Sequence, residues 1–259
     1  MKILIYTLNF YPEKVGIGKY TGEMAKILVK NGHDIKVICA PQYFPDWKVD
    51  LNNYRKEVIE KIDVLRCPIW IPKKLNGFKR LIHLISFSLT SLPILIKQAK
   101  WKPDILITIS PTLFNSLGSL LFSNLLSKKT KNLLHIQDFE LDAAFELGLI
   151  KFQFLKKIAS YIEQKVISSF DSISTISEGM LKKALQKGVS ERKLFLFPNW
   201  VDIKDITLSK YEDRGKNHYR KVLKISKEKI IIMYSGSMNK KQGLENIPIL
   251  VDKCKKIKN

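Results

Sequence analysis

The chain has 259 residues, with 45 Lys plus Arg against 24 Asp plus Glu and a formal net charge of +21. Hydrophobic residues make up 45% of it and charged residues 27%. This is the composition of a globular protein with a buried core, and it excludes a disordered chain, a collagen-like fibre and a disulfide-stapled miniprotein.

The first forty residues predict one β-loop-α-β unit. Residues 2–8 form a short apolar, β-branched run typical of a buried strand. A loop rich in Pro and Gly follows over residues 9–17, and residues 18–30 have helical periodicity. A second apolar run at residues 34–39 predicts the second strand.

The same alternation continues to residue 197. It predicts strands over residues 62–66, 104–109, 132–136, 171–176 and 193–197, and helices over residues 78–98, 112–126, 151–169 and 178–186. Strands that alternate with helices indicate an α/β fold, with a doubly wound parallel sheet and helices on both faces.

The composition changes after Trp200. Residues 204–229 are polar and charged, which predicts a linker with one short basic helix. A strand over residues 230–234 and a helix over residues 244–257 follow. We therefore expect a Rossmann-like N-terminal domain over residues 1–200, a linker or hinge over residues 201–228, and the start of a second domain over residues 229–259.

The three cysteines have no metal-binding spacing, and a reducing cytoplasm is their simplest setting. The N-terminus lacks the features of a signal peptide. Two apolar stretches, residues 81–96 and 105–127, are the candidate membrane spans. The first is short and contains Pro93, and the second is interrupted by Pro111 and several serines, so we expect neither to cross a bilayer.

The cations comprise 39 Lys and only 6 Arg, spread over the whole chain. Nucleic-acid readers depend on Arg forks and clustered basic stripes, so we expect no nucleic-acid partner. A solvated Lys-rich surface and attraction to an anionic membrane leaflet both remain open.

Ligands of an open parallel sheet bind beyond the carboxyl ends of its strands. The loop over residues 9–18 leads from the first strand into a helix, and a helix N-terminus offers free N–H groups to a phosphate. Gly16, Ile17 and Gly18 are the candidate phosphate-binding residues there, and a plain structural turn is the alternative.

His135 ends a strand in the middle of the predicted sheet, and Asp138 follows closely. At this edge a histidine can donate a hydrogen bond to a developing anion or accept a hydroxyl proton, while the carboxylate can position a sugar hydroxyl. Both are candidate catalytic residues. The alternative for His135 is a structural histidine with satisfied hydrogen bonds.

Several segments, read in order, resemble family 4 of the glycosyltransferases, most closely the enzymes of colanic-acid and O-antigen synthesis. They are MKILIYTLNFYPEKVGIGKYTGEMAKIL, APQYFPDW, RCPIWIPKK, LLHIQDFELDAAFELGLI, STISEGMLKKALQKGV, FPNWVD and YSGSMNKKQGLENI. The resemblance covers essentially the whole chain.

The resemblance implies a GT-B fold, in which an N-terminal domain binds the acceptor and a C-terminal domain binds a nucleotide-sugar. It implies a hexosyl- or glycosyltransferase that acts with retention, without metal or cofactor, on a lipid-linked (polyprenyl-diphosphate) oligosaccharide acceptor. It places Gly16 and Gly18 near the donor phosphates, His135 in the cleft, and Gly236 and Lys241 in the first loop of the donor domain.

Only 31 residues, 229–259, follow the hinge, which is one strand and one helix. The donor-binding E-x7-E motif of the family would lie further on. We therefore expect a chain with only the first βα unit of the donor domain, weak or inactive in isolation. The alternatives are a non-catalytic acceptor-binding or scaffold module, or one half of a split enzyme.

Lys73, Lys74, Lys79 and Arg80 precede the long apolar helix predicted over residues 78–98. This arrangement suits docking on an anionic membrane beside a lipid-linked acceptor, with a core helix whose ends are solvated as the alternative. We expect a bacterial cytoplasmic protein that binds peripherally to the inner face of the membrane.

Overall fold

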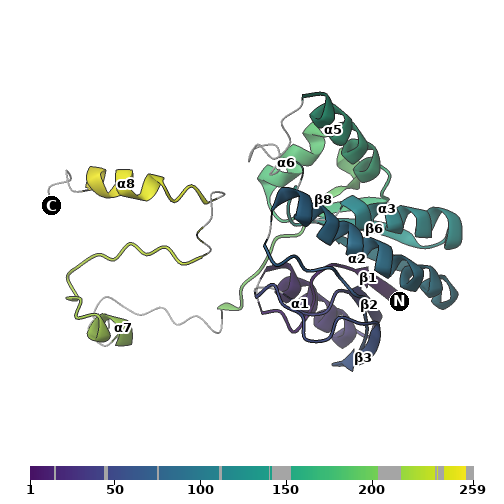
Figure 1. Cartoon of the computed structure of the whole chain (residues 1–259), viewed down its shortest axis with the longest axis horizontal. Coiled ribbons are helices and arrows are strands. Elements are labelled where there is room, and N and C mark those ends of the chain that lie inside the picture. The colour runs from purple at the N-terminus through teal and green to yellow at the C-terminus, as the bar shows by residue number, and fades with distance from the viewer. Residues whose placement is uncertain are drawn as a thin grey trace. The chain divides into compact units, whose positions relative to one another are not determined.

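The computed structural model divides the chain into two compact units, Met1–Trp200 and Val201–Asn259 (Figure 1). The structure describes residues 1–14, 16–43, 46–74, 76–110, 113–139, 141, 153–203, 217–236, 238 and 242–254.

The first unit is built on an eight-stranded sheet with the order β3-β4-β2-β1-β5-β6-β7-β8. Seven strands are parallel, and β3 pairs antiparallel with β4. The strands are β1 (Lys2–Tyr6), β2 (Asp34–Cys39), β3 (Arg55–Ile59), β4 (Ile62–Arg66), β5 (Ile105–Ser110), β6 (Lys131–Ile136), β7 (Ser172–Thr175) and β8 (Leu194–Leu196). The strand order reverses between β1 and β5, which places the expected ligand edge there.

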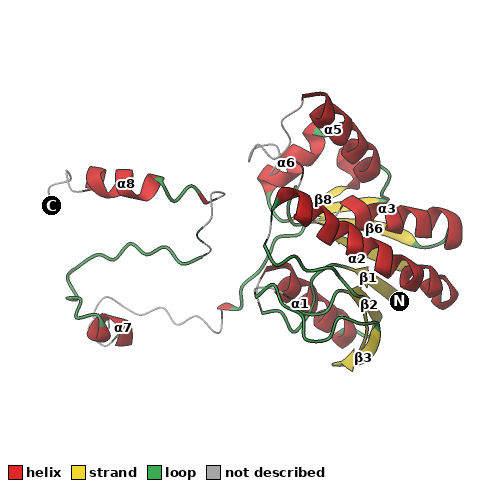
Figure 2. Ribbon diagram, in the orientation of Figure 1, coloured by secondary structure: helices red, strands yellow, loops and turns green. Residues whose placement is uncertain are grey.

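Helices surround this sheet, as the helices and strands of Figure 2 show. They are α1 (Gly16–Lys30), α2 (Gly77–Lys97), α3 (Leu113–Leu121), α5 (Gln153–Ser168) and α6 (Glu178–Gln186). A 3-10 turn, Gln98–Trp101, extends α2, and a π-helical turn, Phe122–Leu126, extends α3.

Alternate residues of each strand belong to different cores, because successive side chains point to opposite faces of a sheet. Leu4 and Tyr6 pack in a core that includes Phe87 of α2 and Phe122 after α3. Ile3 and Ile5 pack instead in a second core with α1. Helices therefore cover both faces, and the α/β prediction is confirmed.

The strand β3 is absent from the sequence-based prediction. Its sequence RKEVI is short and charged, and its residues alternate between half-buried and exposed. An edge strand with that pattern carries little of the apolar signal that identifies buried strands. Pairing with β4 through a tight turn at Glu60 and Lys61, both at positive φ, forms this hairpin.

The second unit contains α7 (His218–Val222) and α8 (Asn246–Cys254) in its described part. The prediction of a strand over residues 230–234 is wrong, since these residues are exposed and form no strand. A strand requires a partner for its backbone groups, and no strand is described elsewhere in this unit. An apolar run alone is therefore not sufficient to form a strand here.

One helix in the described part of the chain, Gly77–Trp101, is long and apolar enough to cross a membrane. Only 28% of its most apolar window is buried inside the molecule.

Candidate functional site

Three loops meet at the carboxyl edge of the sheet around the β1/β5 reversal. They follow β1, β6 and β8. A hydrogen bond joins the last two loops to each other, and the loop after β8 contacts α1 through a hydrogen bond and a ring contact. This edge holds His135 and Asp138 together with the entry to α1.

The loop before α1 is held by a buried carboxylate that the sequence reasoning missed. Glu13 is 2% exposed, and its Oε1 atom accepts hydrogen bonds from Asn9 Nδ2 at 3.2 Å and Tyr43 N at 3.5 Å. A Cβ at Gly18 would lie 2.6 Å from both Glu13 Cβ and Oε2. Gly18 therefore makes room for Glu13.

Gly16 differs from Gly18. It begins α1 at φ +58°, a left-handed conformation that favours glycine, and a Cβ there would meet nothing within 4 Å. It is exposed, and Ile17 beside it is half-buried. The first turn of α1 itself contains no acidic residue, but the Glu13 carboxylate lies beside Gly18, so an anion would approach the positive dipole end of the helix at Gly16.

Arg66, at the end of β4, holds this loop in place through buried hydrogen bonds. Its guanidinium donates to Tyr11 O at 2.5 Å, Ala40 O at 3.0 Å and Glu57 Oε1 at 2.6 Å. The residue is 2% exposed. A charge so deeply buried needs a full set of partners, so Arg66 ties the loop after β1 to the ends of β2 and β4.

His135 lies at the end of β6 and is buried. Its Nδ1 atom is 2.8 Å from Ser174 Oγ on β7, and Gln137 Nε2 donates to His135 Nε2 at 3.2 Å. The Gln137 oxygen accepts from Asn199, so its amide nitrogen faces the ring, and because an amide nitrogen can only donate, Nε2 is the acceptor and the ring proton lies on Nδ1. Burial lowers the pKa of His135 to about 4, which keeps the ring neutral at pH 7.

The hydrogen bonds continue to the last loop of the unit. Asn199 Nδ2 donates to Gln137 Oε1 at 3.3 Å, so donors run from Asn199 through Gln137 to His135 and Ser174. The Phe197 ring meets His135 edge-on at 5.5 Å. The His135 Nε2 lone pair is thus occupied by an amide that a ligand hydroxyl could displace.

Trp200 closes the edge against α1. Its Nε1 donates to Glu23 Oε2 at 2.6 Å, and its ring packs on Tyr20 at 5.4 Å and on Phe197 at 5.8 Å. Three aromatic rings and a charge-assisted hydrogen bond therefore fix the end of the first unit.

The remaining predicted residues are more dispersed. Asp138 is half-buried two residues beyond β6. Lys73, Lys74 and Arg80 are exposed around the start of α2, and Lys79 is half-buried. Gly236 is exposed in the second unit, and Lys241 lies outside the described residues.

The structure thus brings His135, Asp138 and the start of α1 to one edge, and it adds Glu13, Arg66, Gln137 and Ser174. A charged residue ending an apolar strand is the one signal that could have singled out Arg66. Nothing in the local pattern distinguishes Glu13, whose loop mixes apolar and polar residues without a period.

Comparison with known proteins gives a match of residues 15–200 to the Glycosyl transferase 4-like domain. The chain is 40% identical over 262 aligned residues to "Putative colanic acid biosynthesis glycosyl transferase WcaI" of Escherichia coli (strain K12). The alignment covers 98% of this chain and 63% of that relative, so the chain spans less than two thirds of its length.

Two solved structures are similar. The catalytic domain of starch synthase IV from Arabidopsis thaliana, bound to ADP and acarbose, has 15% identity and a TM-score of 0.52, over 78% of this chain and 52% of that one. A sucrose-phosphate synthase from Thermosynechococcus elongatus has 11% identity and a TM-score of 0.49, over 78% and 91%. The first likeness confirms the GT-B type of fold.

Proposed function

Because the chain belongs to the family of glycosyl transferase 4-like domains, we propose that it takes part in glycosyl transfer from a nucleotide-sugar to a lipid-linked oligosaccharide. The pathway would be synthesis of a surface polysaccharide such as colanic acid, O-antigen or capsule. The 40% identity to a relative named for colanic acid biosynthesis carries the proposal. Transfer would retain the anomeric configuration and need neither metal nor cofactor.

The entry to α1 supports a role toward the donor. The leaving group is a nucleoside diphosphate, whose negative charge must be stabilised as the glycosidic bond breaks. Gly16 and the positive end of the α1 dipole would contribute to that stabilisation. Gly236 and Lys241 would add contacts to the diphosphate from the second unit.

The neutral His135 suits a hydrogen-bonding role. With its proton on Nδ1, its Nε2 lone pair would accept from a sugar hydroxyl that displaces the Gln137 amide. Asp138, at the same edge, would orient a neighbouring hydroxyl. Ser174 would hold the ring in the required tautomer.

The start of α2 supports contact with a membrane. Lys79 and Arg80 stand in its first turn, which contains no acidic residue and where the helix dipole disfavours cations. Phe78 and Leu89 of the same helix are 72% and 65% exposed. Apolar side chains beside cations are typical of a helix that rests on an anionic bilayer. Peripheral binding to the cytoplasmic face of the membrane would bring the protein to a lipid-linked acceptor.

The first test is sugar transfer. Purified protein, radiolabelled UDP- or GDP-sugars and membranes containing lipid-linked saccharides are incubated, and label in the organic extract is measured. We expect label to pass into the lipid fraction and His135→Ala to reduce it at least tenfold. Absence of transfer with every donor would favour the non-catalytic or split-enzyme alternative.

The second test is vesicle flotation with phosphatidylcholine alone or mixed with phosphatidylglycerol. We expect binding to the anionic vesicles only, and its loss on changing Lys73, Lys74, Lys79 and Arg80 to Gln, since each cation contributes about 1 kcal/mol at such a surface. The control changes Lys128 and Lys129, which are exposed in the turn before β6. Equal binding to both vesicle types would refute the electrostatic role.

A further inference from the structure

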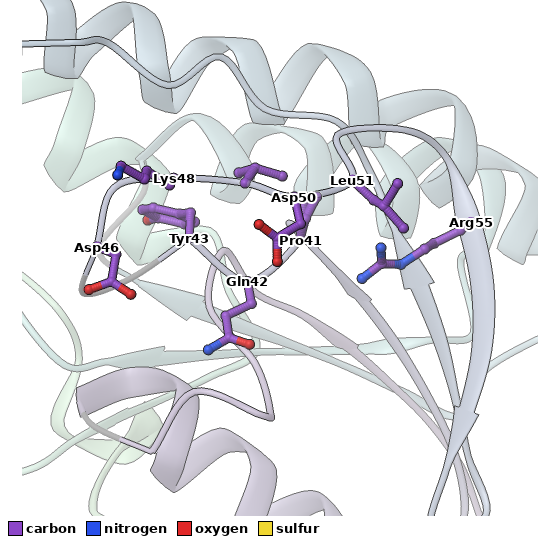
Figure 3. A pocket seen from close by; sticks show the side chains of 9 residues that line it. Pro41, Gln42, Tyr43, Asp46, Lys48, Asp50, Leu51 and Arg55 are labelled. Carbon is purple, nitrogen blue, oxygen red and sulfur yellow. The ribbon is translucent and has the colours of Figure 1, made fainter.

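A pocket of about 580 Å³ opens in the segment that joins β2 to β3 (Figure 3). Its lining is mixed, with two carboxylates, an amide, an amine, a guanidinium and an aromatic ring. The lining residues are Pro41, Gln42, Tyr43, Asp46, Lys48, Val49, Asp50, Leu51 and Arg55. None of them belongs to the edge formed by His135 and α1.

Paired hydrogen bonds fix the far end of this segment. Asn52 Nδ2 donates to Ile69 O at 2.8 Å, and Ile69 N donates to Asn52 Oδ1 at 2.8 Å. Two residues on, Tyr54 Oη donates to Thr90 O of α2 at 2.9 Å. The pocket is therefore preformed, as small-molecule sites usually are.

A ring cluster fixes the near end. His83 of α2 is 1% exposed and lies 5.0 Å from the Tyr43 ring and 5.3 Å from the Trp47 ring. Its Nδ1 atom bonds to Trp70 O at 2.7 Å. The pocket thus lies against α2, the helix that also carries the exposed apolar side chains of Phe78 and Leu89.

The charges of the lining cancel. The lining has two anions, Asp46 and Asp50, and two cations, Lys48 and Arg55. Figure 3 shows the Arg55 guanidinium extending toward Asp50, and its Nε atom also lies 3.8 Å from Glu57 Oε2 on β3. A site for a polyphosphate would carry a clear excess of cations or N–H donors. Alternating acceptors and donors without net charge suit the hydroxyl groups of a neutral sugar, each of which both donates and accepts.

The pocket is also connected to the loop before α1, the proposed donor-binding side. Tyr43, in its wall, donates its backbone N–H to Glu13, the carboxylate that fills the space above Gly18. One residue therefore links the pocket to the loop at the start of α1. A ligand held here would lie between α2 and the edge where transfer is proposed.

We propose that this pocket binds a neutral pyranose of the saccharide acceptor while α2 holds the lipid side of the same molecule. The inference rests on the proposed glycosyl transfer and deepens it. It assigns Asp46, Asp50, Gln42 and Arg55 to recognition of sugar hydroxyls, a role separate from that of His135.

The test is NMR titration of the ¹⁵N-labelled full chain with methyl glycosides of glucose, galactose and mannose, and with lactose. Inorganic phosphate and UDP serve as anionic probes. We expect at least one sugar to shift the backbone amides of Gln42, Asp46 and Asp50 with millimolar affinity, and both anions to leave them unchanged. Asp46→Asn and Asp50→Asn should each weaken sugar binding about fivefold or more.

Both aspartates are exposed, so their amide variants should fold, which a thermal unfolding curve verifies. Glu191→Gln, exposed and remote in sequence from the pocket, is the matched control and should bind as the unmodified chain does. Pocket shifts caused by phosphate, shifts by sugars only at other residues, or unchanged affinity in both aspartate variants would each overturn the proposal.

Failure of the pocket and failure of the proposed function give different results. If sugar transfer occurs and Asp46→Asn and Asp50→Asn leave it unchanged, the pocket proposal is refuted and the proposed enzymatic function stands. If a neutral sugar shifts the amide signals of the pocket but the protein transfers no sugar, the sugar-binding site stands and the enzymatic role is refuted.

Discussion

The Nδ1 atom of His135 on β6 lies 2.8 Å from the Oγ atom of Ser174 on the neighbouring strand β7. The two residues are register partners in the parallel sheet, so the strand pairing itself brings them together. Ser174 can therefore accept the Nδ1 proton and orient the ring, and together with the Gln137 amide at Nε2 it favours the Nδ1–H tautomer.

Ser174→Ala should remove this preference without emptying the core. We expect ¹⁵N NMR of the unmodified protein at pH 7 to show a neutral His135 with its proton on Nδ1, and the variant to show a mixture of both tautomers. Sugar transfer should fall about tenfold, and Ser174→Thr, which keeps a hydroxyl, should restore part of it. A pure Nδ1–H tautomer in the alanine variant would contradict the assignment.

The pKa of His135 makes stability depend on pH. Burial lowers this pKa from 6.5 to about 4, so between these values the unfolded chain binds a proton that the folded chain does not. The free energy of unfolding should therefore fall as the pH drops from 6.5 toward 4, by up to about 1.4 kcal/mol per pH unit. Burial lowers the pKa of His83 as well and adds in the same direction.

Urea denaturation at pH 7, 6 and 5 measures this slope. His135→Gln should flatten it, whereas His218→Gln, exposed in the second unit, should leave it unchanged. An identical slope in the His135 variant would show that another group causes the acid sensitivity.

Gly18→Ala should destabilise the first unit. The new methyl carbon would lie 2.6 Å from Glu13 Cβ, which is anchored to the backbone, so the loop must shift at a cost of about 1–3 kcal/mol. Gly179→Ala in α6 is the matched control, because its Cβ would meet only Ser177 Oγ at 4.0 Å. That change should stabilise by about 0.5–1 kcal/mol through helix propensity. Chemical denaturation compares the two, and equal effects would disprove the steric argument.

Arg66→Gln should be among the most disruptive single changes. It leaves Tyr11 O and Ala40 O without their charged donor and Glu57 without its 2.6 Å partner, a loss of about 3–5 kcal/mol. Lys56→Gln breaks the ion pair with Asp63, in which Lys56 is 58% exposed, and should cost less than about 1 kcal/mol. A small effect at Arg66 would mean that water replaces its partners.

Phe78→Ser should weaken binding to anionic vesicles without lowering thermal stability, since this side chain is 72% exposed on α2. Leu185→Ser, at a 42% exposed position of α6, is the control and should bind normally. Normal flotation of the Phe78 variant would indicate that the cations act without the apolar face.

The local sequence pattern predicted the alternation of strands and helices, because buried parallel strands are continuous apolar runs and helices carry a 3.6-residue stripe. It also placed His135 and the start of α1 at one edge, since the carboxyl ends of parallel strands share that edge. It missed β3, and it predicted a strand over residues 230–234 that is not formed. In both cases pairing with a neighbouring strand, rather than local hydrophobicity, decides whether a strand exists.

The surroundings of these residues depend on long-range contacts in the folded chain. The tautomer of His135 depends on Ser174, 39 positions away, and the loop at Glu13 depends on Arg66, whose hydrogen bond to Tyr11 spans 55 positions. The pocket beside α2 likewise needs Asn52 to meet Ile69 and Tyr43 to meet His83. Such contacts join segments with no common local pattern, so they arise only when the sheet brings those segments together.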